Sequence, residues 1–257
     1  MWRMELKPAA EMLCDSPMLS AEELKTRLCK VGEERYHHRH PFHLLMHEGQ
    51  LTRGQLQAWA LNRYYYQSII PMKDSIILSR SADPDFRRTW RKRVVDHDGD
   101  ATHEGGIERW IRLAEATGLE RERVLRGEEV LPATRYAVDA YLSLVRNQSF
   151  LEAVASSLTE MFSRDLITLR MDRLRQYYPW LSGGLDYFTA RLDQAPEDAR
   201  FALHWVTENA RTRTEQELAI GALLAKCDIL WAQLDALYFA YVQPGWPPPG
   251  AFRIQES

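Results

Sequence analysis

Apolar residues recur every three or four positions along most of the chain, which is the spacing of an amphipathic helix. The pattern is clearest near the C-terminus, where Cys227, Leu230, Leu234, Leu237 and Tyr241 form one stripe. The alternating runs of β-branched residues that a sheet would need are missing. The pattern therefore predicts an all-α protein.

Capping residues mark several helix boundaries. Ser20-Ala-Glu-Glu23 and Thr52-Arg-Gly-Gln55 are capping boxes, which begin helices. Asp83-Pro84 supplies an N-cap and a proline at the first helical position, and Gly118 is placed to end a helix in the left-handed conformation. Further helices are predicted over residues 132–146, 149–176, 187–194, from 196 onward, and 212–241.

The composition supports one compact folded core, since 45% of the 257 residues are hydrophobic and 27% are charged. No linker rich in Gly or Ser divides the chain, so we expect one bundle of about seven helices around a single cavity, over residues 20–243. Residues 1–19 would then form an N-terminal extension. The proline-rich residues 244–257 would form an extended tail, because proline cannot continue a helix.

The charge and the cysteines exclude several classes of protein. With 33 basic and 36 acidic residues the formal charge is −3, and the basic residues are scattered, so we expect no nucleic-acid partner. Cys14, Cys29 and Cys227 stand far apart, which suits neither a disulfide framework nor a zinc site. No signal peptide or membrane-spanning stretch is evident, so we expect a cytoplasmic protein without a membrane partner.

One basic residue interrupts an apolar helical face. Arg63 lies on the stripe that runs from Leu56 to Ile70, and Pro71 is expected to interrupt this helix just before Lys73. A guanidinium in such a stripe needs an anion, because an isolated buried charge is too costly to keep. Both a protein carboxylate such as Asp74 and a ligand remain open as that anion.

A second basic residue shares a helical face with a histidine. Arg93 and His97 stand four residues apart, and a neighbouring cation favours the neutral, basic form of the imidazole. The alternative is a solvated helix end formed with the aspartates between positions 96 and 100. Tyr187 and Arg191 repeat the four-residue spacing on another helix.

The segment from Tyr36 to His47 carries five of the eight histidines, so a metal site has to be considered. His43 and His47 have helical ligand spacing, but neither a His-Glu-x-x-His motif nor a repeated Glu-x-x-His pair is present. A nucleophile elbow and a Gly-rich phosphate loop are missing as well. A metal site is therefore a minor alternative, and some of these histidines are expected to cap or pack.

Longer motifs in a fixed order are more specific than any of these clusters. From about residue 36 to residue 241, the chain resembles the pyrroloquinoline quinone synthase family. The resemblance is carried by His40-Pro-Phe-His43, Trp59-Ala-Leu-Asn-Arg-Tyr-Tyr-Tyr-Gln67, Ile70-Pro-Met-Lys-Asp74, Arg93-Val-Val-Asp-His-Asp-Gly99, Gly105-Gly-Ile-Glu-Arg-Trp110 and Ser156-Ser-Leu-Thr-Glu160. It implies a haem-oxygenase-like bundle of seven helices, a homodimer, and activity in the cytoplasm without metal, flavin or haem.

The resemblance also implies a reaction. The family closes a ring in a tricarboxylated quinoline-dione amino acid and oxidises it by eight electrons, with dioxygen as co-substrate reduced to hydrogen peroxide and water. The substrate would serve as its own redox cofactor, and other proteins of the pathway are possible partners. A polyanionic substrate would explain inward-facing cations, because guanidinium forks grip carboxylates and the ligand supplies the missing counter-charge. The empty cavity should then be strongly electropositive.

Family roles carry over by position. The resemblance implies catalytic roles for His97 as general base, for Tyr187 and Arg191 in closing over substrate and in oxygen binding, and for His37. It implies substrate contacts from Tyr36, Arg63, Tyr66, Gln67, Lys73, Arg93, Tyr141, Thr159, Glu160, Arg170 and Lys226. The chain departs from the family at Ile167, where some members have a histidine, and at Ala190, where others have serine.

Three other functions remain open. A metal-dependent oxygenase on the same bundle would use the histidine segment and carboxylates such as Glu160. A thiaminase-like hydrolase would need a pocket cysteine, which the sequence does not offer. A non-catalytic protein that carries the quinone or its precursor belongs to a different class and would consume no oxygen.

Overall fold

The computed structural model describes residues 17–254, and all its regular elements are helices, as the hydrophobic pattern predicts. The α-helices are α2 (Ala21–Arg35), α3 (Pro41–His47), α4 (Arg53–Arg80), α5 (Pro84–Asp98), α6 (Gly106–Thr117), α7 (Arg121–Arg126), α8 (Pro132–Asn147), α9 (Phe150–Ala155), α10 (Ser163–Tyr177), α11 (Asp186–Asn209) and α12 (Arg213–Tyr241). Short 3₁₀ helices are η1 (His37–Arg39), η2 (Ser156–Phe162) and η3 (Pro179–Gly184). Eleven α-helices within the described residues replace the seven that were predicted.

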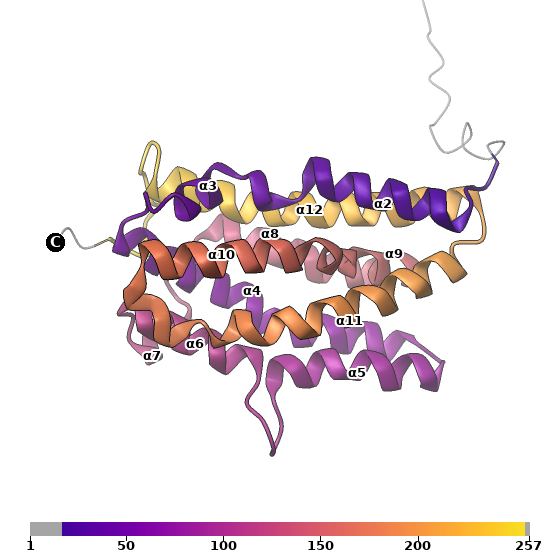
Figure 1. Ribbon diagram of the computed structural model, residues 1–257, viewed down its shortest axis with the longest axis horizontal. Coiled ribbons are helices and arrows are strands. Elements are labelled where there is room, and N and C mark those ends of the chain that lie inside the picture. The colour runs from indigo at the N-terminus through magenta and orange to yellow at the C-terminus, as the bar shows by residue number, and fades with distance from the viewer. Residues whose placement is uncertain (1–16, 255–257) are drawn as a thin grey trace, which may run out of the picture.

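The helices run roughly side by side in a bundle (Figure 1). Helices α2 and α12 pack together along one edge, and α5 and α11 lie towards the opposite edge. Helix α4 packs against α5, α6 and α8, so it runs through the middle of the bundle. None of the helices in the described part of the chain combines the length and hydrophobicity needed to span a bilayer.

The predicted helix starts are confirmed at the level of single hydrogen bonds. The Ser20 side chain accepts from the backbone N–H of Glu23, whose carboxylate in turn accepts from the Ser20 N–H. The same reciprocal pair of bonds begins α4 at Thr52 and α9 at Ser149. Gly118 ends α6 at φ 98°, a conformation that only glycine adopts without strain. These termini depend on neighbours within four residues, which is why the sequence predicts them.

Two prolines do not end their helices, and the predicted breaks there are wrong. Helix α4 continues through Pro71 to Arg80, and α11 is one helix through Pro196 rather than two. Proline removes one helical hydrogen bond, but the buried faces on either side of it hold the helix in place. The continuity of α11 keeps residues before and after Pro196 on one face.

The single helix predicted over residues 149–176 is also wrong, because η2 interrupts it. The hydroxyl groups at both ends of η2 bond back to the chain: Ser156 Oγ donates to Ala153 O and Ser163 Oγ to Glu160 O. Such bonds compete with the regular helical ladder and favour tighter turns. The tighter winding brings the side chains of Ser157 and Glu160 towards α4 and α11.

The proline-rich tail is non-helical, as predicted, and up to residue 254 it folds back onto the bundle. Phe252 is buried, its N–H donates to Glu129 O, and its carbonyl accepts from the hydroxyl of Tyr241. Cys14 and most of the predicted N-terminal extension lie outside the described residues.

Candidate active site

One cavity lies inside the bundle between α4, α10 and α11. Its walls contain both polar and apolar side chains. The lining residues are Tyr36, His37, Arg63, Tyr66, Gln67, Ile70, His97, Trp110, Thr159, Glu160, Ser163, Leu166, Ile167, Arg170, Tyr187, Phe188, Arg191 and Leu230. Most of the predicted site residues are therefore brought together around one space.

Four predicted site residues are buried but stand behind this lining: Lys73, Arg93, Tyr141 and Lys226. Arg93, Tyr141 and Lys226 contact lining residues rather than the cavity itself, and Lys73 contacts Asp74 and Ser157 behind the lining. Lys226 Nζ donates to the hydroxyl of Tyr66 at 2.7 Å, and Arg93 lies 3.9 Å from Glu160. Any influence of these four residues on a ligand in this structure passes through the lining.

The basic residues divide into two groups, and the first has no carboxylate partner. Arg63, Arg170 and Lys226, here called the unpaired cluster, form no ion pair with any residue that the structure describes. Aromatic faces replace the missing acids: Arg63 lies 4.1 Å from the ring centroid of Tyr66, and Lys226 Nζ lies 3.4 Å from that of Tyr141.

The shifted pKa values reflect this lack of counter-charge. Burial, reinforced by Arg63, lowers the pKa of Arg170 to about 10. Burial, with Arg63 and Lys73 nearby, places the pKa of Lys226 well below its usual range. Burial, together with the positive charges of Arg63 and Arg170, holds the pKa of His37 well below its ordinary value. Among residues 17–254, no carboxylate lies within ion-pair distance of these cations to stabilise them.

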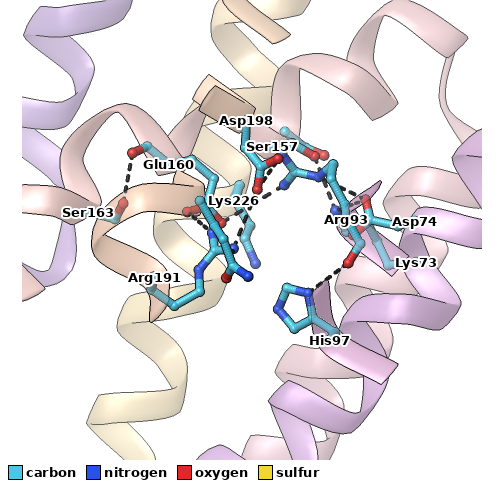
Figure 2. Close-up of polar contacts among 12 residues, drawn as sticks. Lys73, Asp74, Arg93, His97, Ser157, Glu160, Ser163, Arg191, Asp198 and Lys226 are labelled. Carbon is cyan, nitrogen blue, oxygen red and sulfur yellow. Dashed lines mark hydrogen bonds and ion pairs between the residues drawn. The ribbon is translucent and has the colours of Figure 1, made fainter. Parts of the chain in front are cut away.

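In the second group of basic residues, each positive charge is paired with a carboxylate of the protein. This group is called the paired cluster here and joins three cations to three carboxylates (Figure 2). Its members are Lys73, Arg93 and Arg191 with Asp74, Glu160 and Asp198.

Arg93 is the centre of the paired cluster. Its Nε lies 3.3 Å from Asp74 Oδ1, and its Nη1 lies 3.3 Å from Asp198 Oδ2. Its burial acts to lower the pKa of the guanidinium, but Asp198, Asp74 and Glu160 outweigh burial and raise that pKa. Asp74 also accepts from Lys73 and from the indole N–H of Trp90.

Arg191 carries the paired cluster to the cavity wall. Its Nη2 donates to Glu160 Oε2 at 2.7 Å, and its Nη1 lies 3.4 Å from Asp198 Oδ2. Burial acts to raise the pKa of Glu160, but Arg191 and Arg93 overcome it and lower that pKa to about 2. Glu160 is therefore a carboxylate at neutral pH.

The expectation of a cavity that is strongly electropositive throughout is wrong at this end. Lys73, Arg93 and Arg191 obtain their counter-charge from the protein, whereas Arg63, Arg170 and Lys226 do not. The physical reason is that α4, η2 and α11 bring three acids next to the first group, a juxtaposition that spacing along one helix does not reveal. The carboxylate expected near Arg63, Asp74, binds Lys73 and Arg93 instead.

His97 is buried at the cavity wall, so the alternative of a solvated helix end is wrong for it. Its Nδ1 lies 2.9 Å from the carbonyl oxygen of Arg93. A carbonyl only accepts, so Nδ1 carries the proton and Nε2 is the basic nitrogen. Burial and the charge of Arg191 lower the pKa of His97 to about 4, which keeps the imidazole neutral at physiological pH.

Tyr187 stands beside the paired cluster on α11. Its hydroxyl donates to Gln67 Oε1 at 3.0 Å, and its ring meets that of Trp110 edge to face at 4.8 Å. Burial raises the pKa of Tyr187, so it is a neutral phenol. A neutral phenol and a guanidinium one helical turn apart can both donate hydrogen bonds to an oxygen species between them, once the single O–H of the phenol turns from Gln67 towards it.

The histidine-rich segment mostly caps and packs, as expected. The His40 ring accepts from the N–H of Phe42 at the start of α3, and its Nε2 lies 3.0 Å from Asp235. His43 packs edge to face against His37 and contacts Arg170. Within residues 17–254, no three His, Cys, Asp or Glu side chains come together in a way that could hold a metal ion.

The sequence analysis did not identify Asp198. It lies seven residues after Arg191 and eleven after Tyr187, a spacing that places all three on one helical face. This signal was available, but an expected helix break at Pro196 concealed it. Ile167, where the resemblance implies a histidine in some family members, lines the cavity one turn before Arg170.

Similarity to known proteins extends over nearly the whole chain. The model of the TENA/THI-4/PQQC family matches residues 27–236. The chain is 56% identical to a pyrroloquinoline-quinone synthase of Acidiphilium cryptum over 91% of its own length and 96% of that protein's. It is 53% identical to a bifunctional coenzyme PQQ synthesis protein C/D of Methylorubrum extorquens, over 93% of its own length and 65% of that protein's.

Solved structures share the fold at low sequence identity. A domain of unknown function with a haem oxygenase-like fold from Shewanella denitrificans superposes with a TM-score of 0.73 at 13% identity, covering 92% of this chain and all (100%) of that one. A TenA homologue from Pseudomonas syringae gives 0.67 at 11% identity, with 87% and 97% covered. The predicted haem-oxygenase-like architecture is therefore confirmed.

Proposed function

The chain belongs to the TENA/THI-4/PQQC family, and from this premise we propose that its cavity carries out pyrroloquinoline-quinone synthesis. The activity is that of an oxidoreductase in the last step of pyrroloquinoline quinone biosynthesis. We propose that the substrate is the tricarboxylated quinoline-dione amino acid implied by the sequence motifs and that dioxygen is the electron acceptor.

The unpaired cluster is the observation that supports this substrate best. Arg63 and Arg170 line one buried space, Lys226 stands directly behind it against Tyr66, and none of the three has a protein carboxylate partner among the described residues. Keeping such charges unpaired is unfavourable unless a ligand compensates them. A ligand with several carboxylates supplies that compensation through charge-assisted hydrogen bonds.

His97 suits the role of general base. Its Nε2 is unprotonated at neutral pH, and its ring is oriented by the hydrogen bond from Nδ1 to the Arg93 carbonyl. We propose that Nε2 takes a proton from a ring carbon of the substrate as the electron pair of that C–H bond enters the ring system. The resulting electron-rich anion gives its electrons to dioxygen, which takes up protons to become hydrogen peroxide.

Arg191 and Tyr187 would act on the oxygen side of this step. Both line the cavity near His97, and both can donate hydrogen bonds. Negative charge develops on oxygen as it is reduced, and preorganised donors stabilise such charge more than they stabilise neutral dioxygen. We propose that no resident metal, flavin or haem takes part, because the quinone-forming substrate itself supplies the redox group.

Assembly and location are part of the proposal. We propose a homodimer in the cytoplasm. The relative from Methylorubrum extorquens, in which proteins C and D form one chain, supports a second pathway protein as a partner.

Turnover of the authentic precursor tests this function. Purified protein mixed with precursor in air should release the quinone while oxygen falls and peroxide appears, and His97→Ala should lose turnover. Anaerobic mixing should give a bound, partly converted species, so release of finished quinone without oxygen would refute the mechanism. A requirement for stoichiometric iron or manganese would favour a metal oxygenase, and binding without oxygen consumption would favour a carrier.

A further inference from the structure

We infer that Asp198 is a positioning residue that neutralises one end of the cavity, so that a polycarboxylate is gripped by the cations at the other end. The inference rests on the proposed function, because it concerns how that substrate is oriented. It assigns a role to a residue outside the cavity lining.

Asp198 acts on two arginines at once. Its Oδ2 lies 3.3 Å from Nη1 of Arg93 and 3.4 Å from Nη1 of Arg191, and only 10% of its side chain is exposed. On its other side it lines an outer groove between α5 and α11, together with Gln194 and Glu197. Asp198 therefore meets substrate only through the guanidiniums that it holds (Figure 2).

The acids make the two ends of the cavity unequal. The paired cluster contains as many carboxylates as cations, whereas the unpaired cluster contains cations alone. A substrate carboxylate at the paired end would compete with Glu160 and Asp198 for the same N–H donors and would be repelled by both. At the unpaired end it meets Arg63 and Arg170, which have no carboxylate partner among the described residues.

This asymmetry sets an orientation. The carboxylates of the substrate bind next to Arg63 and Arg170, with Lys226 behind Tyr66 adding its positive charge, and the part of the substrate with the least negative charge faces His97 and Arg191. Arg191 is then left to donate to oxygen-derived anions that form during turnover instead of being occupied by a substrate carboxylate. Asp198 contributes by making the reversed orientation unfavourable, which is a form of selection against the wrong complex.

The variant Asp198→Asn tests the inference, because it removes the charge and keeps the shape. Benzene-1,3,5-tricarboxylate serves as a non-reacting probe, and its affinity measured by calorimetry should increase roughly fivefold, the effect of exposing one additional cationic charge. With the precursor, kcat and KM should fall together, because a fraction of the substrate binds tightly but reversed. If Asp198 had a purely structural role, the variant would have a lower kcat/KM, and its affinity for the tricarboxylate probe would not increase.

Two further variants complete the design. Asp198→Glu keeps the charge and should restore the wild-type probe affinity and the wild-type kcat and KM. Glu197→Gln removes a charge from the neighbouring exposed residue, for which no ion pair is found within residues 17–254, and should change nothing. Unchanged probe affinity in folded Asp198→Asn would overturn the inference, as would a lower KM with unchanged kcat.

A measurement on the unaltered protein covers the case in which Asp198→Asn does not fold. A crystal structure with the tricarboxylate probe should place its carboxylates beside Arg63 and Arg170. A probe carboxylate within hydrogen-bond distance of Arg93 or Arg191 would contradict the inference. The probe experiments do not require turnover, so they separate a failure of this inference from a failure of the proposed function.

Discussion

The two ends of the cavity contain the same number of cations and differ in their acids. At the paired end Arg191 and Arg93 meet Glu160 and Asp198, and the pKa values of both guanidiniums are raised. At the unpaired end burial lowers the pKa values of Arg170 and Lys226. The cations of the paired end are stabilised without a ligand. The cations of the unpaired end gain electrostatic stabilisation when an anionic ligand binds.

The difference shows how one bundle can combine stability with affinity. Removing one partner of a buried ion pair leaves an uncompensated charge, so each member of the paired cluster supports the folded state. The unpaired cations instead lower the stability of the empty protein, and a ligand recovers that free energy on binding. Variants at the two ends should therefore change stability in opposite directions.

The largest effect is expected from Arg191→Gln. Removal of this guanidinium should lower kcat by about 10²- to 10³-fold, the usual loss when one stabilising donor is removed from a preorganised site. It should also lower the free energy of unfolding by roughly 2–3 kcal/mol, because buried Glu160 and Asp198 lose a partner. Steady-state kinetics and urea denaturation measure the two effects.

Arg200→Gln on the same helix is the matched control. Arg200 is exposed and forms no ion pair with the described residues, so its removal should leave both quantities unchanged. An Arg191→Gln protein with wild-type stability would show that the ion pairs of the paired cluster contribute little.

A smaller and opposite change in stability is expected from Lys226→Met. The KM should rise by about 10-fold, because Lys226 orients the hydroxyl of the lining residue Tyr66 and adds a positive charge behind it. The free energy of unfolding of the empty protein should increase by about 1 kcal/mol, because an uncompensated buried lysine is replaced by an apolar side chain of similar length. Thermal and urea unfolding of the ligand-free variant and wild-type proteins show whether the free energy of unfolding rises or falls.

The control here is Lys30→Met, which removes an exposed lysine from α2, where its pair with Glu34 is also exposed. Destabilisation of Lys226→Met to the extent expected for Arg191→Gln would mean that both ends depend on their cations in the same way.

The most gradual effect concerns acid pH. The folded protein holds the pKa of His97 at about 4, below the ordinary 6.5, so between these values the unfolded chain binds a proton that the folded chain refuses. Stability is therefore complete above pH 6.5 and falls as the pH drops towards 4, with a slope of up to about 1.4 kcal/mol per pH unit from this histidine. Glu160, with a folded pKa of about 2 against 4.5, adds a further loss below pH 4.5.

Urea denaturation at several pH values between 4.5 and 7.5 measures this slope. His97→Asn should flatten it, and saturating tricarboxylate should flatten it as well, because an anion near Arg63 and Arg170 makes protonation of His37 less unfavourable. If neither the variant nor the ligand alters the pH dependence of the free energy of unfolding, the loss of stability at acid pH comes from groups outside the cavity.

Much of this site can be predicted from the sequence. The four-residue spacing of Arg93 and His97, and of Tyr187 and Arg191, predicts that each pair shares a helical face, and all four are buried together. Family motifs predict the residues that line the cavity. The sequence does not reveal that Lys73 and Arg93 stand behind the lining, because that depends on how α4 and α5 pack against their neighbours.

The sequence by itself determined where the capped helices α2, α4 and α9 begin and which residues share a helical face, because a capping bond such as that of Ser20 with Glu23 joins groups within one turn. Only the tertiary structure decided which cations are neutralised. Arg93 meets acids from α4, η2 and α11, whereas Arg63, on the same central helix as Asp74, meets none within ion-pair distance in the described part of the chain. Electrostatic compensation depends on distances of a few ångströms between remote segments, and helix packing sets those distances.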